Sequence, residues 1–200
     1  MAGDADAIIG IYRRHAAAWS RARGTSLDEK PWIDRFGSLL PALGNVLDLG
    51  CGSGEPIATY LHRQGFWIVG ADSAPEMIAV FRSNLPEERA IVHDMRNLRL
   101  NETFSGILAW DSFFHLPRED QRAMFKLFRE HSEPLTALMF TSGDEEGEAI
   151  GEFANEPLYH ASLDASEYRH LLGESGFFVV AHLAEDERCG GRTIWLAQRM

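Results

Sequence analysis

Residues 45–56 read NVLDLGCGSGEP, and this stretch decides the fold of the chain. An apolar run typical of a buried strand, Val46 to Leu49, leads into glycines at alternate positions, and Pro56 then opens a predicted helix. Glycine lets the backbone approach a ligand closely and adopts positive φ at little cost. A helix N-terminus adds free N–H groups and a partial positive charge. A strand, a tight turn and a helix start in this order predict a nucleotide-binding corner.

Composition narrows the range of partners. The chain has 200 residues, enough for one domain, and a formal net charge of −11. Nucleic-acid binding relies on neutralising phosphates, so we expect no nucleic-acid partner. The cysteines, Cys51 and Cys189, lack metal-ligand spacing and a disulfide framework, so we expect no metal site and a cytoplasmic location. The acidic N-terminus is unlike a signal peptide, and no apolar run approaches the ~20 residues that span a bilayer, so we expect no membrane association.

Hydrophobic periodicity predicts an alternation of helices and strands. Two helices, at about 4–23 and 27–40, precede the first strand. Ser73 to Glu76 and Asp164 to Glu167 match the capping-box pattern of a helix start. Strand–helix alternation implies parallel strands with right-handed crossovers, and therefore an α/β fold with a three-layer, doubly wound sheet. Further parallel strands are predicted at 66–72, 90–95, 104–110 and 135–141.

The pattern changes after the fifth strand. Residues 143–162 are acidic and contain scattered aromatic side chains, which predicts a lid or an insertion loop. Two strands at 177–183 and 193–198, with Gly190-Gly191 between them, predict an antiparallel hairpin that closes a seven-stranded, mostly parallel sheet. We therefore expect one domain in four parts: an N-terminal helical cap at 1–44, a cofactor-binding core at 45–142, the lid or loop at 143–162, and a closing helix and hairpin at 163–200.

The spacing of the glycines argues against a dinucleotide. That fingerprint is G-x-G-x-x-G, whereas Gly50, Gly52 and Gly54 alternate here and are followed by Glu55. A carboxylate at this position would repel a pyrophosphate. Asp48, inside the strand, suits a ligand with an ammonium group. The turn therefore favours a cationic or zwitterionic ligand, and a nicotinamide-dependent oxidoreductase stays a less favoured alternative.

The acidic residue and the three alternating glycines, Asp48 to Gly54, resemble motif I of the class I S-adenosylmethionine-dependent methyltransferases. The resemblance covers nearly the whole chain and is greatest to the small-molecule type, which has helices before the core sheet. It implies the Rossmann-like methyltransferase fold and S-adenosylmethionine as cofactor. Asp72 matches the acidic residue that holds the ribose hydroxyls, and a carboxylate is a natural acceptor for two hydroxyl donors. Asp94 matches the acceptor of the adenine amino group, with Met95 against the ring.

The remaining cofactor contacts follow from the same resemblance. Trp110 flanks the methionine moiety, Cys51 contributes its backbone N–H, and the N-terminal helix brings Tyr12 over the cofactor. The full predicted cofactor set is Tyr12, Asp48, Gly50, Cys51, Gly52, Gly54, Asp72, Ser73, Met77, Asp94, Met95 and Trp110.

The acceptor side is predicted from fewer signals. His115 follows the fourth strand near the expected methyl position, and imidazole can take a proton near neutral pH, so His115 and His160 are candidate catalytic residues. Asp111, Phe114 and Tyr159 are candidate substrate contacts. For each histidine and aromatic residue, ordinary packing is the alternative.

These observations predict a methyltransferase that acts on an unidentified small molecule by in-line displacement. The segment Asp111-Ser112-Phe113-Phe114 lacks the Asn/Asp-Pro-Pro-aromatic motif of enzymes that methylate amino groups in nucleic acids or glutamine. A non-catalytic S-adenosylmethionine-binding protein is the main alternative. The sequence leaves open the acceptor, the methylated element and whether the protein is a homodimer.

Overall fold

The computed structural model of the protein describes the backbone of residues 2–200 and the side chains of residues 7–200. Its helices are α1 (Ala2–Arg23), α2 (Lys30–Gly37), α3 (Ile57–Arg63), α4 (Pro75–Asn84), α5 (Arg118–Glu130) and α6 (Ala165–Glu174). Its strands are β1 (Asn45–Leu49), β2 (Trp67–Asp72), β3 (Arg89–Val92), β4 (Phe104–Ala109), β5 (Ser132–Ser142), β6 (Gly147–Phe153), β7 (Glu156–Ser162), β8 (Phe177–Asp186) and β9 (Arg192–Arg199). Three short 3₁₀ turns are η1 (Met95–Asn97), η2 (Phe113–His115) and η3 (Glu187–Cys189).

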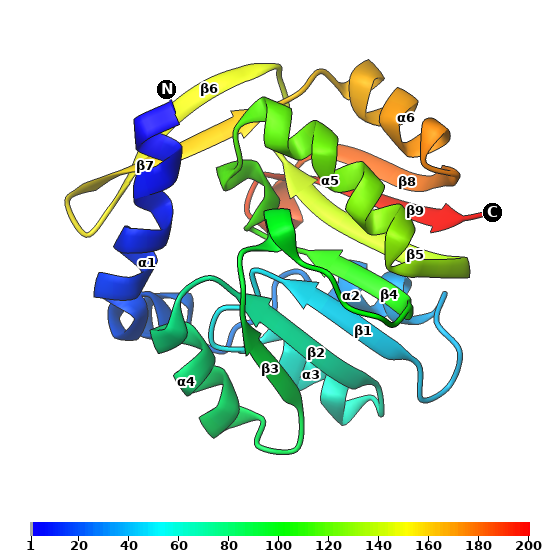
Figure 1. Ribbon diagram of the computed structural model, residues 1–200, viewed down its shortest axis with the longest axis horizontal. Helices are drawn as coiled ribbons and strands as arrows, with labels where there is room; N and C mark the ends of the chain where they lie inside the picture. Colours follow the sequence, from blue (N-terminus) through cyan, green and yellow to red (C-terminus); the bar gives the residue numbers. More distant parts are fainter. Residues whose placement is uncertain (1) are drawn as a thin grey trace.

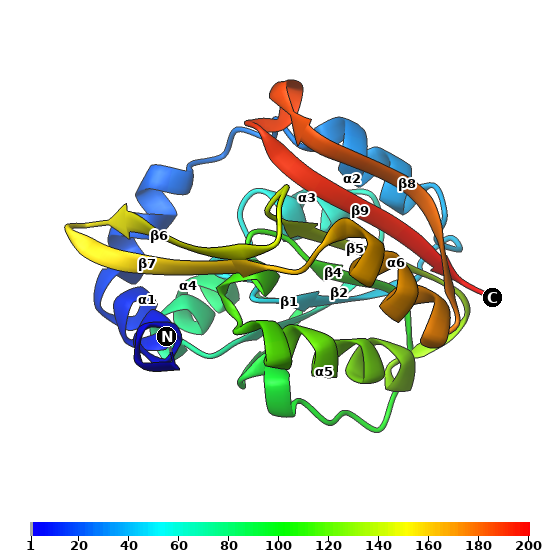
Figure 2. The same ribbon diagram turned by 90° about the horizontal axis from the view of Figure 1, so that it is seen from above.

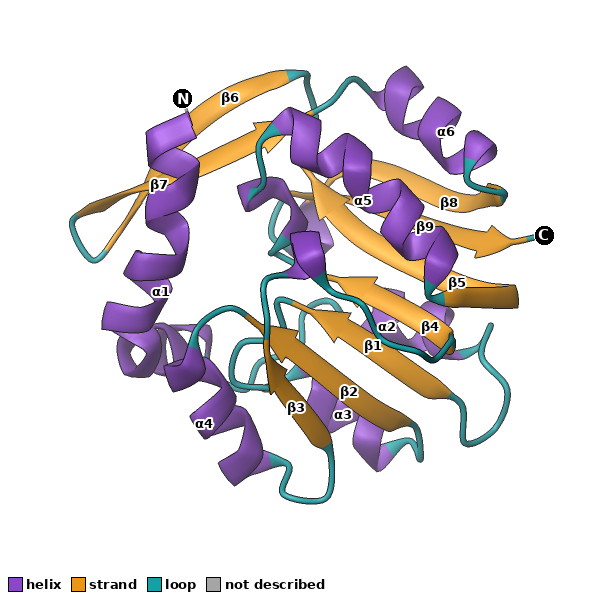
Figure 3. Ribbon diagram, in the orientation of Figure 1, coloured by secondary structure: helices purple, strands orange, loops and turns teal. Residues whose placement is uncertain are grey.

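The main sheet has seven strands in the order β3-β2-β1-β4-β5-β9-β8 (Figures 1 and 3). The pairs β1–β2, β1–β4, β2–β3 and β4–β5 are parallel, whereas β9 runs antiparallel to β5 and β8. The predicted doubly wound sheet with an antiparallel closing hairpin is therefore confirmed. The order reverses between β1 and β4, which is where ligands bind in sheets of this kind.

Helices cover both faces of the sheet (Figure 2). The side chains of β1 alternate between two apolar clusters, with Val46 in the cluster of α2, α3 and α4, and Leu47 and Leu49 in the cluster of α5 and α6. This alternation follows from the two-residue period of a strand. Both faces of β1 are buried, so its sequence is nearly continuously apolar.

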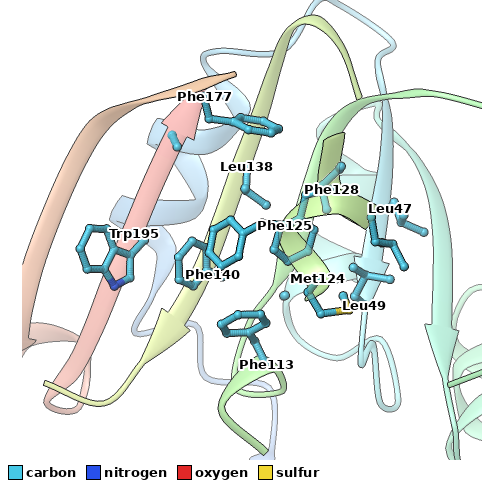
Figure 4. Close-up of a cluster of buried hydrophobic side chains, with 14 of the residues drawn as sticks. Leu47, Leu49, Phe113, Met124, Phe125, Phe128, Leu138, Phe140, Phe177 and Trp195 are labelled. Atoms are coloured by element: carbon cyan, nitrogen blue, oxygen red, sulfur yellow. The ribbon is translucent and has the colours of Figure 1, made fainter. Parts of the chain in front are cut away.

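An aromatic cluster fills the space between α5, α6 and the sheet (Figure 4). Phe140 lies at its centre, with ring centroids 5.1 Å from Phe113 and 5.9 Å from Trp195. Phe125 and Phe128 of α5 pack against Phe113 at 6.1 and 5.9 Å. Phe113 belongs to η2, so the same cluster fixes the turn that carries His115.

Residues 143–162, predicted as a lid or an insertion loop, contain two paired strands that the sequence analysis did not predict. β6 and β7 pair antiparallel as a separate two-stranded sheet. Ala154 and Asn155 join them, both at positive φ (54° and 62°), as a two-residue hairpin turn requires. None of the residues of β6 is buried, so the sequence of this strand lacks the apolar alternation that predicts a strand.

The hairpin and α1 lie together at one end of the main sheet (Figures 1 and 2). Leu158 and Tyr159 of β7 pack on Ile8 and Ile11 of α1. Figure 2 shows both elements beside the carboxyl ends of the parallel strands, so they form a cover over that end. None of the described helices is both long and apolar enough to cross a membrane.

Two helix starts differ from the predicted capping boxes. Ser73 does not cap α4; the N-cap is Ala74, whose N–H is bonded to the Asp72 carboxylate at 2.8 Å. Asp164 does cap α6, accepting from the Ser166 N–H at 2.7 Å, but Glu167 pairs with Arg122 and does not close the box. In the first case no side chain caps the helix, and the carboxylate at the strand end accepts from the N–H of the N-cap residue instead.

The aromatic cluster gives a test of the fold. We expect Phe140→Ala to lower the free energy of unfolding by about 3–5 kcal/mol, because Phe140 is fully buried and its removal leaves a cavity. Phe178→Ala on β8 is the control, since that ring is 45% exposed, and its cost should stay below about 1 kcal/mol. Urea unfolding measures both, and equal losses for the two variants would contradict the assigned core.

Candidate functional site

A cavity of about 1130 Å³, including space at its mouth, lies at the carboxyl ends of β1, β2 and β4. The glycine turn, residues 50–54, lines one part, and Ile8, Ile9, Tyr12 and Trp19 of α1 line another. A ligand in this cavity would therefore contact the glycine turn on one side and α1 on the other.

The glycine turn has a left-handed backbone at all three glycines and no space for a side chain at the first and the third. Gly50, Gly52 and Gly54 all have positive φ, at 73°, 54° and 79°. A Cβ on Gly50 would lie 2.3 Å from Ser112 Cβ, and one on Gly54 would lie 2.9 Å from Phe81 Cδ2. Conformation and close approach thus both require glycine at the first and third positions.

Asp72 ties this turn to the end of β2. Its Oδ2 accepts from the Gly52 N–H at 3.0 Å, and its Oδ1 accepts from the Ala74 N–H at 2.8 Å. Burial raises the pKa of Asp72, and these two N–H groups oppose the shift. Each carboxylate oxygen has a further lone pair, so Asp72 can still accept the two hydroxyl groups of a ribose at the cavity wall.

Asp48 is a buried carboxylate with no hydrogen-bond partner among the described residues. Burial raises its pKa to about 7, and the neighbouring charge of Asp72 adds to the shift. A carboxylate in this state gains most from a cation placed beside it. The site therefore suits an ammonium group, as the sequence predicts.

Asp94 lines the cavity, but its carboxylate is already engaged. Its two oxygens accept from the Arg96 side chain at 2.6–3.1 Å, and Oδ1 also accepts from the Arg96 N–H at 3.0 Å. Burial raises the pKa of Asp94, but the hydrogen bonds from Arg96 outweigh it and the net shift is downward. An adenine amino group would have to share this carboxylate with Arg96, which the sequence did not predict.

His115 and Tyr12 meet at the cavity wall. His115 Nδ1 lies 2.8 Å from the carbonyl oxygen of Tyr159, and its Nε2 lies 2.8 Å from the Tyr12 hydroxyl. A carbonyl only accepts, so Nδ1 carries the proton and Nε2 accepts from Tyr12. Burial lowers the pKa of His115 to about 4, so this imidazole is neutral at pH 7 and its bare nitrogen is occupied. His115, which the sequence suggests as a general base, therefore uses its basic nitrogen to accept the hydrogen bond of the Tyr12 hydroxyl.

Other predicted acceptor residues are placed differently. The Asp111 carboxylate lines the cavity but forms a bidentate pair with Arg192, at 2.7–2.9 Å. Tyr159 contributes its carbonyl, while its side chain is buried against α1. Phe114 and His160 contact each other and line a separate hollow at the base of the hairpin. The side chains of Tyr159, Phe114 and His160 thus lie outside the lining of the main cavity.

The other predicted cofactor residues line the cavity, and several lining residues were not predicted. Trp110 has a buried Nε1 for which the described residues provide no partner. Arg23, bonded to the buried Glu29, and Trp19 also line the cavity. Trp19 belongs to the apolar stripe of α1, whereas nothing local in the sequence marks Arg23. Predicted residues that line the cavity as expected are Gly50, Cys51, Gly52, Gly54, Ser73, Met77, Met95 and Trp110.

No group of three or more His, Cys, Asp or Glu side chains among the described residues is arranged to hold a metal ion. Backbone N–H groups, carboxylates and aromatic rings line the cavity instead. These groups fit a zwitterionic nucleoside. Its ribose would lie against Asp72 and its ammonium group against Asp48, and the glycine turn would allow the ligand to approach the backbone closely.

Comparison with known proteins agrees with this geometry. Residues 46–134 match the model of a family described as "Methyltransferase domain". The trans-aconitate 2-methyltransferase of Escherichia fergusonii is 41% identical over 76 residues, which cover 36% of this chain and 29% of that protein. The chain therefore aligns with under a third of the length of this relative.

Solved structures share the fold at low identity. CalS10, an amino pentose methyltransferase from Micromonospora echinaspora with bound SAM, has a TM-score of 0.72 and 21% identity over 92% of this chain and 95% of its own. Magnesium protoporphyrin IX methyltransferase (ChlM) from Synechocystis with bound SAH has a TM-score of 0.76 and 18% identity over 98% of this chain and 100% of its own. Residues 46–134 therefore match the methyltransferase domain family, and the chain has the fold of methyltransferases whose structures hold SAM or SAH.

The pKa of Asp48 generates a stability prediction. Between its unfolded value of 3.8 and its folded value of about 7, the unfolded chain loses a proton that the folded chain keeps, so stability falls as pH rises through this window. Asp48→Asn removes this loss. We expect the variant to be more stable than the wild type at pH 8, by on the order of 2–4 kcal/mol, and the difference to shrink towards pH 5.

Urea unfolding at several pH values measures the effect of Asp48→Asn. Asp144→Asn, on the exposed stretch before β6, is the matched control and should not change the pH profile. A destabilising Asp48→Asn substitution at pH 8, or a difference that does not vary with pH, would contradict the buried unpaired carboxylate.

Proposed function

We propose that the protein transfers a methyl group from S-adenosylmethionine to a small-molecule acceptor. The observation that carries this proposal is the pair of cavity carboxylates, Asp48 and Asp72, beside a turn whose three glycines all have positive φ. The relative from Escherichia fergusonii, by its name, methylates trans-aconitate, which supports an acceptor of small-molecule size here.

The chain's own residues would hold the cofactor at separate points. Asp72 would accept the ribose hydroxyls, and Asp48 would pair with the ammonium group of the methionine part. Met77 and Met95, which both line the cavity, would pack against the adenine, with Arg96 and the amino group sharing Asp94. When bound, S-adenosylmethionine supplies an electrophilic methyl group on a positively charged sulfur.

The protein's part in such a transfer is alignment and exclusion of water. α1 covers the cavity with Ile8, Tyr12 and Trp19, and the ring centroids of Trp19 and Phe153 of the hairpin lie 5.0 Å apart. Tyr12 and His115 stand on the same wall, where they would orient an acceptor. Because His115 is neutral and its Nε2 is occupied, the site supports a nucleophile that needs no strong base.

Binding of S-adenosylhomocysteine tests the cofactor assignment. Isothermal titration should show binding to the wild type, and Asp72→Ala should weaken it by at least about tenfold, because hydrogen bonds to a charged group contribute on the order of 1.5–3 kcal/mol each. Asp34→Ala, an exposed position on α2, is the control and should bind like the wild type. Absence of binding, or equal affinity for the Asp72 and Asp34 variants, would overturn the assignment.

A further inference from the structure

The direction of one hydrogen bond constrains the acceptor. The Tyr159 carbonyl fixes the proton of His115 on Nδ1, and His115 Nε2 then takes the proton of the Tyr12 hydroxyl. A hydroxyl has one proton and two lone pairs, so Tyr12 Oη has only lone pairs left for a ligand. A group that binds to this oxygen must bring its own N–H or O–H. A carboxylate cannot, because it only accepts.

The charges of the cavity point the same way. Five carboxylate side chains and two guanidinium groups line it. Both guanidinium groups are paired within the protein, Arg23 with Glu29, and Arg96 with Asp94 and Asp120. Arg192, which reaches the wall through Asp111, is paired with that carboxylate. An anionic acceptor would therefore meet an excess of negative charge and would have to displace an existing ion pair.

The wall around Tyr12 combines apolar side chains with nearby carboxylates. Ile8, Ile9 and Leu116 line the cavity together with His115, whose imidazole is neutral at pH 7. Burial raises the pKa of Tyr12, and the charges of Asp111 and Asp72 add to the shift. The apolar side chains favour the uncharged form of a reacting group, and the carboxylates attract a cation from solvent. An amine satisfies both conditions, because it arrives as an ammonium ion and reacts as the free base.

We infer, on the basis of the proposed function, that the acceptor is an amine that donates an N–H to the Tyr12 hydroxyl oxygen. The ammonium ion first releases a proton to solvent. The nitrogen lone pair then forms the N–C bond to the methyl carbon while the electron pair of the C–S bond passes to sulfur. The product carries the positive charge on nitrogen and loses its extra proton to solvent. His115 is a positioning residue in this scheme, since it acts through Tyr12.

A panel of shape-matched acceptors tests this inference. Benzylamine and hexylamine are compared with benzyl alcohol, hexanol, benzoate, hexanoate and trans-aconitate. The readouts are formation of S-adenosylhomocysteine and calorimetric binding of each probe to the protein saturated with S-adenosylhomocysteine. We expect the amines to bind and react at least tenfold better than the alcohols and carboxylates. Preference for an alcohol or carboxylate, or no response to either amine, would overturn the inference.

Two variants test the hydrogen-bond direction itself. Tyr12→Phe should weaken hexylamine binding by about tenfold, the loss expected for one hydrogen bond. His115→Phe frees the Tyr12 proton to donate into the cavity, so hexanoate binding should rise severalfold while hexylamine loses its advantage. Tyr60→Phe, at an exposed hydrogen bond to Asp34, is the matched control and should resemble the wild type. An unchanged probe preference in His115→Phe would contradict the proposed direction.

The two proposals fail in different ways. If S-adenosylhomocysteine binds and a carboxylate is the preferred acceptor, the amine inference falls and the methyltransferase proposal stands. If S-adenosylhomocysteine does not bind to the wild type, both the methyltransferase proposal and the amine inference fail.

Discussion

The bridge from the Asp72 carboxylate to the Gly52 and Ala74 N–H groups is the contact on which the rest of the site depends. It joins the turn after β1 to the start of α4, two segments that are distant in sequence. Without it, two backbone donors would be left unpaired at the cavity wall, at a cost of about 1–3 kcal/mol each. One carboxylate thus fixes the shape of the turn and keeps lone pairs available for a ligand.

Asp48, in the neighbouring strand β1, shows the opposite arrangement. It is buried without a hydrogen-bond partner among the described residues, and its position costs stability in the absence of a cation. An apolar residue at this buried position of β1 would give a higher free energy of unfolding. The carboxylate is understandable as a binding group whose cost is offset when an ammonium ion is present.

The sequence was sufficient to predict the fold because local signals and the global pattern agreed. The apolar run at Val46 to Leu49, the glycine spacing and the hairpin around Gly190-Gly191 each specify one element, and their order specifies the sheet. The β6–β7 hairpin was missed because one of its strands faces solvent and carries charges where a buried strand carries apolar residues. Hydrophobic periodicity arises from the burial of one face, so an exposed strand shows little periodicity.

The donor side of the site was more predictable than the acceptor side for a similar reason. Gly50 to Gly54 and Asp72 act through backbone geometry near their own position in the sequence, which spacing reveals. Tyr12, His115 and Tyr159 come together from three separate elements. The protonation of His115, the direction of its hydrogen bonds and the pairing of Arg192 with Asp111 depend on which side chains meet, and sequence spacing does not encode that.

The hydrogen bonds through His115 also connect the two parts of the cover. The Tyr159 carbonyl of β7 holds the proton of His115 on Nδ1, and His115 Nε2 then sets the direction of the Tyr12 hydroxyl of α1. A backbone carbonyl on the hairpin thus decides which polarity a side chain of the helix presents to the cavity, although that carbonyl belongs to a different element from the hydroxyl.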